Sequence, residues 1–110
     1  MAFVASAGTG GTVTGTGEEL RRKLPALKIV VVEPDGSPVL SGGQPGPNKL
    51  VGTSPELVPA ILKTEVYDEI RRVRDDDALE TCRLLACQED FHHKSLALHK
   101  EARLLLMSAV

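Results

Sequence analysis

Aromatic side chains are scarce in this 110-residue chain, which has no Trp and an aromatic content of 3%. Its core must therefore be built from aliphatic residues. Neither sign of charge dominates, since the formal net charge is −2 at pH 7, and nucleic acid or an anionic membrane surface is not an expected partner. No apolar stretch reaches the ~18 residues that a membrane-spanning helix needs.

Cysteine is also rare, and the N-terminus has no basic segment before its short apolar run. Cys82 and Cys87 are too few for a disulfide framework, which favours a reducing compartment. A secretory signal is not expected. The predicted location is cytoplasmic, and a plastid or mitochondrial parent stays open because a transit peptide would precede residue 1.

The apolar runs predict a fold of the α/β class. Residues 2–7 and 28–33 are typical of short buried strands, the second being a continuous β-branched run that is covered on both faces. Between them, residues 10–24 read as a turn and a helix that ends before Pro25. A strand, a helix and a strand in this order predict a parallel βαβ unit.

The remainder divides into a turn-rich connection and a helical end. Residues 34–59 are dominated by turn formers, with enough aliphatic residues among them to favour partial packing. A helical turn is expected at 58–62 and a third strand at 66–73. From Asp75 onward the pattern is helical, Asp75 or Asp77 can cap the helix, and residues 77–80 have the spacing of a capping box. A long helix is expected from there to the end.

The most informative motif follows the first predicted strand. Residues 8–17 read Gly-Thr-Gly-Gly-Thr-Val-Thr-Gly-Thr-Gly, and such a loop before a helix can bind a phosphate through close backbone approach, hydroxyl donors and free helix N–H groups. A dinucleotide fingerprint would need glycine at Val13, and a Walker A loop would need lysine at Thr16. A nucleotide-binding unit stays open because Glu33 ends the second strand. A glycine-rich helix start without a ligand is the other alternative.

This loop resembles the phosphate loop of the pyridoxal-phosphate-dependent cysteine synthases (O-acetylserine sulfhydrylases). The resemblance covers about residues 2–90 colinearly. The segments that carry it further are 32–34, 37–43, 45–47, 67–70 and 78–81.

The resemblance implies an α/β, parallel-sheet segment of a fold type II pyridoxal-phosphate enzyme. The family replaces the acetate of O-acetylserine with sulfide, in cysteine biosynthesis, and is usually homodimeric. Gly8, Thr9, Gly10, Gly11 and Thr12 would hold the cofactor phosphate. The implied partners are a second copy of the chain or full-length relatives.

Two parts of the family's active site have no counterpart in this sequence. The Schiff-base lysine would lie before residue 1, and the Ser-Ser-Gly segment that contacts the pyridine nitrogen would follow near residue 91. We therefore expect residues 1–90 to form a truncated cysteine-synthase-like segment that is not catalytic alone, and residues 91–110 to form a divergent helical tail. The alternative is a non-catalytic module that binds a phosphate ligand or a partner protein.

Cysteines and histidines near the end of the chain raise the question of a metal site. On one helix, Cys82 and Cys87 would lie about 140° apart and could not face the same ion. Glu89 and His93 have suitable helical spacing, but a closed site needs more ligands. No metal ligand is therefore predicted.

Overall fold

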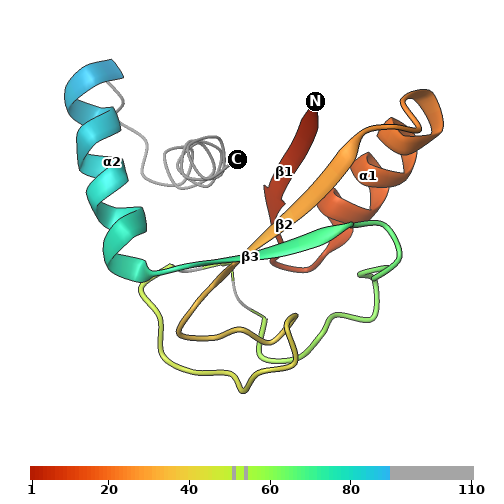
Figure 1. Ribbon diagram of the computed structural model, residues 1–110. Coiled ribbons are helices and arrows are strands. Elements are labelled where there is room, and N and C mark those ends of the chain that lie inside the picture. The colour runs from red at the N-terminus through yellow and green to blue at the C-terminus, as the bar shows by residue number, and fades with distance from the viewer. Residues whose placement is uncertain (51, 54, 90–110) are drawn as a thin grey trace.

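The computed structural model describes residues 1–50, 52–53 and 55–89, and these form a three-stranded parallel sheet with two helices (Figure 1). The elements in chain order are β1 (Ala2–Ser6), α1 (Gly11–Lys23), β2 (Lys28–Pro34), β3 (Glu69–Val73) and α2 (Asp75–Glu89). The strand order is β1-β2-β3, and both neighbouring pairs are parallel. The predicted α/β class and parallel βαβ unit are confirmed.

The central strand β2 is buried on both faces, as its β-branched run predicts. Ile29 and Val31 have no exposed surface and pack in clusters that include side chains of α1. Val30 and Val32 point to the other face and pack together in a separate cluster. This alternation follows from the two-residue period of a strand, which sends successive side chains to opposite faces.

One face of α1 binds the segment formed by residues 61–68. The Thr14 hydroxyl donates to the Ile61 carbonyl at 3.3 Å and accepts from the Lys63 N–H at 3.2 Å. One helical turn later, Glu18 pairs with the Lys63 ammonium at 2.6 Å. Thr14 and Glu18 share a face because residues four apart in a helix are neighbours. The 61–68 segment therefore runs alongside the helix instead of extending freely from it.

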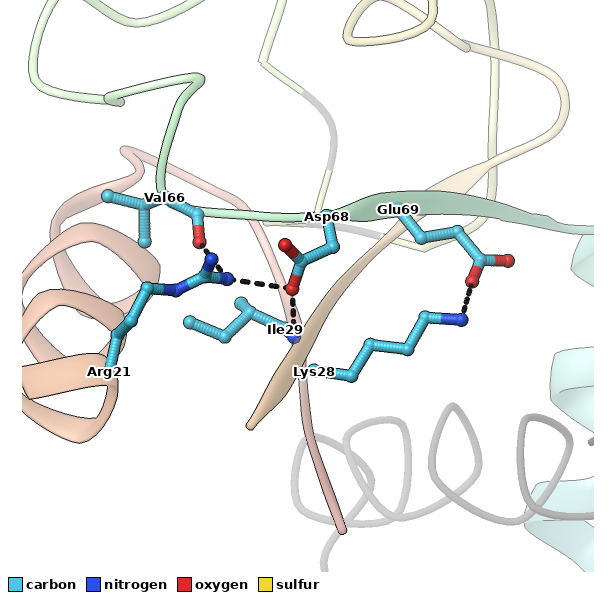
Figure 2. A network of polar contacts seen from close by, with 6 residues as sticks. All are labelled: Arg21, Lys28, Ile29, Val66, Asp68 and Glu69. Carbon is cyan, nitrogen blue, oxygen red and sulfur yellow. Dashed lines mark hydrogen bonds and ion pairs between the residues drawn. The ribbon is translucent and has the colours of Figure 1, made fainter. Parts of the chain in front are cut away.

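Arg21 continues these contacts to the start of β3, as Figure 2 shows. Its guanidinium donates to the Val66 carbonyl at 3.1 Å and to the Asp68 carboxylate at 2.7 Å. The same carboxylate oxygen accepts from the Ile29 N–H at 2.8 Å, and the Asp68 N–H donates back to the Ile29 carbonyl. Arg21, and then the Ile29 N–H, lower the pKa of Asp68. The network ties the last turns of α1 to the beginnings of β2 and β3.

Two predicted elements in this region differ from the structure. Residues 58–62 were predicted to form a helical turn. They contain no helix, and the chain instead makes a tight turn over residues 59–62, closed by the Leu62 N–H donating to the Pro59 carbonyl at 3.0 Å. The third strand begins at Glu69 and not at Val66. Val66 packs in the cluster beneath α1, so it precedes the strand that it was expected to start.

The helix α2 begins at Asp75, where the sequence pattern predicted it to start, but the predicted capping residues are wrong. Asp75 and Asp77 both lie within the first turn, and neither is the capping residue. The first turn is closed by the Ala78 N–H, which donates to the Arg74 carbonyl at 3.0 Å. The Asp75 carboxylate accepts from the backbone N–H of Lys49 at 2.6 Å, which anchors the preceding connection to the helix.

The connection between β2 and β3 is irregular but packed, as expected from its interleaved aliphatic residues. Val39 and Leu50 are buried at 8% and 6% exposure. The predicted helical tail, residues 91–110, lies outside the described residues. In the part of the chain that the structure describes, no helix is long and apolar enough to cross a bilayer.

Candidate functional site

A pocket of about 210 Å³ opens where β1 turns into α1. Four of the five predicted phosphate-binding residues line it, and the fifth, Gly11, lies between them as the first residue of α1. The full lining consists of Ser6, Gly8, Thr9, Gly10, Thr12, Val13 and Gly52. The structure therefore brings the predicted site residues together in one concave surface.

The N-terminus of α1 is suited to an external anion. Among the residues that the structure describes, no side chain caps the helix with a hydrogen bond, and its first turn contains no acidic residue. Within the described part of the chain, the Gly11 N–H makes a long contact, 3.5 Å, with the Thr9 hydroxyl oxygen. By contrast, the first turn of α2 already carries three aspartates, residues 75–77. Unpaired N–H groups and the positive end of the helix dipole favour a bound anion at α1.

An added side chain would meet different surroundings at each of the three glycines before and at the start of α1. A Cβ atom at Gly8 would lie 2.7 Å from the Gly52 carbonyl oxygen, and one at Gly10 would lie 2.6 Å from Leu62 Cβ. Gly10 also has a φ of 86°, which disfavours other residues. A Cβ at Gly11 would meet only one side-chain oxygen, at 3.7 Å. Among the described residues, apart from its chain neighbours and the helix backbone, no other atom lies within 4 Å of that position, so a ligand can approach the Gly11 backbone there.

The four threonines of the motif lie in three different environments. Thr9 and Thr12 are exposed and line the pocket, so their hydroxyl groups are available to a ligand. Thr14 is 7% exposed and its hydroxyl is bonded to residues 61 and 63. Thr16 is exposed on α1 outside the pocket lining. The two threonines of the predicted set, Thr9 and Thr12, are therefore the two of the motif that line the pocket.

Glu33 stabilises the connection after β2. It is 2% exposed, and its carboxylate accepts from the Leu40 N–H at 2.8 Å and from the Ser41 hydroxyl. Burial, and then the nearby charge of Glu33, raise the pKa of Tyr67. Because both carboxylate oxygens of Glu33 are engaged by the chain itself, the structure argues against the alternative of a nucleotide-binding unit, in which Glu33 would bind a ribose. The sequence signal that could have indicated this role is an acidic residue near the end of a strand that is otherwise apolar and buried, because a buried carboxylate needs hydrogen-bond donors from the chain.

The cysteines do not build a metal site in the described part of the chain. Cys82 is half-buried, Cys87 is exposed, and neither forms a disulfide. Among residues 1–50, 52–53 and 55–89 there is no group of three Cys, His, Asp or Glu side chains that could hold a metal ion.

Comparisons with known proteins agree with this geometry. A family model described as pyridoxal-phosphate dependent enzyme matches residues 1–92. Over 88 residues the chain is 61% identical to the probable cysteine synthase of Bacillus subtilis and 49% identical to a cysteine synthase of Staphylococcus aureus. Each match covers 80% of this chain and 28% of the relative. The chain thus spans a little over a quarter of the length of these curated relatives.

Solved structures of similar enzymes share the fold. A crystal structure of O-ureido-L-serine synthase matches with a TM-score of 0.88 and 31% identity, over 99% of this chain and 35% of that one. O-acetylserine sulfhydrylase isoform 3 from Entamoeba histolytica matches with a TM-score of 0.81 and 36% identity, over 89% of this chain and 29% of that one. The parallel sheet and its two helices are therefore arranged as in these enzymes.

Proposed function

The chain belongs to the pyridoxal-phosphate-dependent enzyme family, and we propose that it supplies the part of a cysteine synthase that binds the phosphate group of pyridoxal phosphate. The parent reaction would convert O-acetylserine and sulfide into cysteine and acetate, a transferase step of amino-acid biosynthesis. The observation that carries the proposal is the pocket at the uncapped, acid-free start of α1, which the predicted phosphate-binding residues surround.

In this proposal, Gly8, Thr9, Gly10, Gly11 and Thr12 bind the cofactor phosphate. The backbone N–H groups at the start of α1 and the hydroxyl groups of the two threonines donate hydrogen bonds to the phosphate oxygens, and the helix dipole favours the dianion. When bound, pyridoxal phosphate supplies an electron sink for the reaction. The contribution of this chain is to hold and orient that group by its phosphate end, and no catalytic residue is assigned to the segment.

The proposal extends to organisation, partners and location. Residues 1–90 would form the cysteine-synthase-like unit and residues 91–110 a separate helical tail, in agreement with a family match that ends at residue 92. The unit would act as a homodimer or in association with full-length relatives. A cytoplasmic location is in keeping with Cys82 and Cys87, which form no disulfide.

Nuclear magnetic resonance titration of the full 110-residue chain tests this proposal. Inorganic phosphate and pyridoxal 5′-phosphate should shift the backbone amide signals of residues 8–12, whereas pyridoxal, which has no phosphate, should not. Thr12→Val removes a hydroxyl that lines the pocket. A hydrogen bond to a charged group contributes about 1.5–3 kcal/mol, so the phosphate affinity should fall about tenfold or more.

Thr16→Val is the matched control, because Thr16 is also an exposed threonine, one helical turn further along α1 and outside the pocket lining. It should bind phosphate as the unsubstituted chain does. The proposal is refuted if phosphate leaves the signals of residues 8–12 unchanged. It is also refuted if the Thr12 and Thr16 variants lose affinity equally.

A further inference from the structure

Leu62 forms a wall directly against Gly10, the residue that precedes α1. Leu62 is 6% exposed, and a Cβ atom at Gly10 would lie 2.6 Å from Leu62 Cβ and 3.0 Å from Leu62 Cα. Both the side chain and the backbone of Leu62 therefore pack closely against Gly10 and restrict the position of its backbone. Gly10 in turn lines the pocket and is the N-cap residue of α1, directly before the N–H groups that begin the helix.

A single hydroxyl group holds the two peptide groups that flank Leu62. The Thr14 hydroxyl donates to the carbonyl of Ile61 at 3.3 Å and accepts from the N–H of Lys63 at 3.2 Å. The Thr14 N–H donates to the Gly10 carbonyl at 3.0 Å. Gly10, Thr14 and Leu62 are thus joined in a closed ring of contacts, although Leu62 is distant from the other two in sequence.

From this ring we propose that Thr14 is a positioning residue for the phosphate-binding pocket. Its hydroxyl fixes Leu62, Leu62 fixes Gly10, and Gly10 fixes the first N–H groups of α1. The inference rests on the proposed function of the pocket. Thr14 does not line the pocket, so it acts without touching the ligand. If Thr14 only filled space beneath the helix, valine, which has almost the same shape, would replace it without loss.

Two variants of Thr14 and one control separate these roles. Thr14→Val keeps the shape and removes both hydroxyl bonds, whereas Thr14→Ser restores the hydroxyl. Asp68→Asn is the control, because it weakens the network with Arg21 at the other end of α1. All variants are titrated with inorganic phosphate as full chains, under conditions in which each is folded.

We expect Thr14→Val to lower the phosphate affinity about three- to tenfold, as the loss of one or two net hydrogen bonds would. Thr14→Ser should stay within about twofold of the unsubstituted chain, and Asp68→Asn should leave the affinity unchanged. Without ligand, the amide order parameters of Gly10 and Gly11 should fall in Thr14→Val and recover in Thr14→Ser. A merely structural role would not produce this pattern.

The outcomes distinguish the inference from the proposed function. Unchanged phosphate affinity in Thr14→Val overturns the inference and leaves the phosphate site intact. If the unsubstituted chain does not bind phosphate, the proposed function fails, and unchanged order parameters in Thr14→Val would then overturn the positioning role independently. If Thr14→Val does not fold, Leu62→Val replaces it, since it thins the wall beside Gly10 and keeps the hydroxyl bonds. Unchanged affinity and order parameters in Leu62→Val overturn the inference.

Discussion

Replacing Gly10 with alanine should destabilise the protein strongly, because two independent effects oppose a side chain at this position. The backbone of Gly10 is left-handed, with a φ of 86°, and the added Cβ would lie 2.6 Å from Leu62 Cβ and 3.0 Å from Leu62 Cα. The left-handed conformation costs an L-residue about 1–2 kcal/mol. Crowding a packed site costs about 1–3 kcal/mol more.

Together these effects predict that Gly10→Ala lowers the free energy of unfolding by about 2–5 kcal/mol. A natural domain has a total stability of about 5–15 kcal/mol, so the loss is a large share of it. The start of α1 must also shift to relieve the overlap, because the backbone of Leu62 is part of the obstacle. The variant should therefore bind phosphate less well even where it remains folded.

Substitutions at two other glycines separate the cost of the left-handed backbone from the cost of crowding. Gly42 has a φ of 84° and nothing within 4 Å of an added Cβ, so Gly42→Ala should show the conformational cost alone, about 1–2 kcal/mol. Gly15 lies inside α1 with nothing within 4 Å, so Gly15→Ala should stabilise the protein by about 0.5–1 kcal/mol. Urea unfolding followed by far-ultraviolet circular dichroism measures all three, since the chain has no Trp for fluorescence.

The reasoning is refuted if Gly10→Ala is no less stable than Gly42→Ala. That result would mean that Leu62 does not press on Gly10, and the wall described above would not exist. Destabilisation by Gly15→Ala would contradict the open helix surface at that position.

Two further substitutions test contacts away from the pocket. Glu33→Gln weakens the acceptors for the Leu40 N–H and the Ser41 hydroxyl and should cost about 1–2 kcal/mol in urea unfolding, and a stability equal to that of the parent chain would contradict the structural role of Glu33. Because Arg21 lowers the pKa of Asp68, the Asp68 carboxylate stabilises the fold above its unfolded pKa of about 3.9, and this contribution is lost as the pH falls through the lower folded value. Asp68→Asn should thus cost up to about 1 kcal/mol at pH 7 and little at pH 2, and an equal loss at both pH values in acid-series unfolding would exclude this linkage.

The parts of the fold that were predicted correctly depend on local sequence. The β-branched run of β2 and the glycine-rich start of α1 each specify a backbone conformation through their own residues, and a strand, a helix and a strand in this order leave the parallel crossover as the favoured topology. The start of α2 at Asp75 was predicted correctly, but the capping box at residues 77–80 was not formed. Asp75 instead binds the backbone of Lys49, 26 residues away. No local pattern contains that contact.

The same division applies to the candidate site. The sequence by itself predicted which residues would bind a phosphate, since glycine flexibility, threonine hydroxyls and the unpaired N–H groups of a helix start are properties of one short segment. Only the tertiary structure decided that Thr12 faces the pocket while Thr14 binds the 61–68 segment, and that Glu33 serves the connection after β2. These roles depend on which distant residue meets each side chain, and packing between elements decides that.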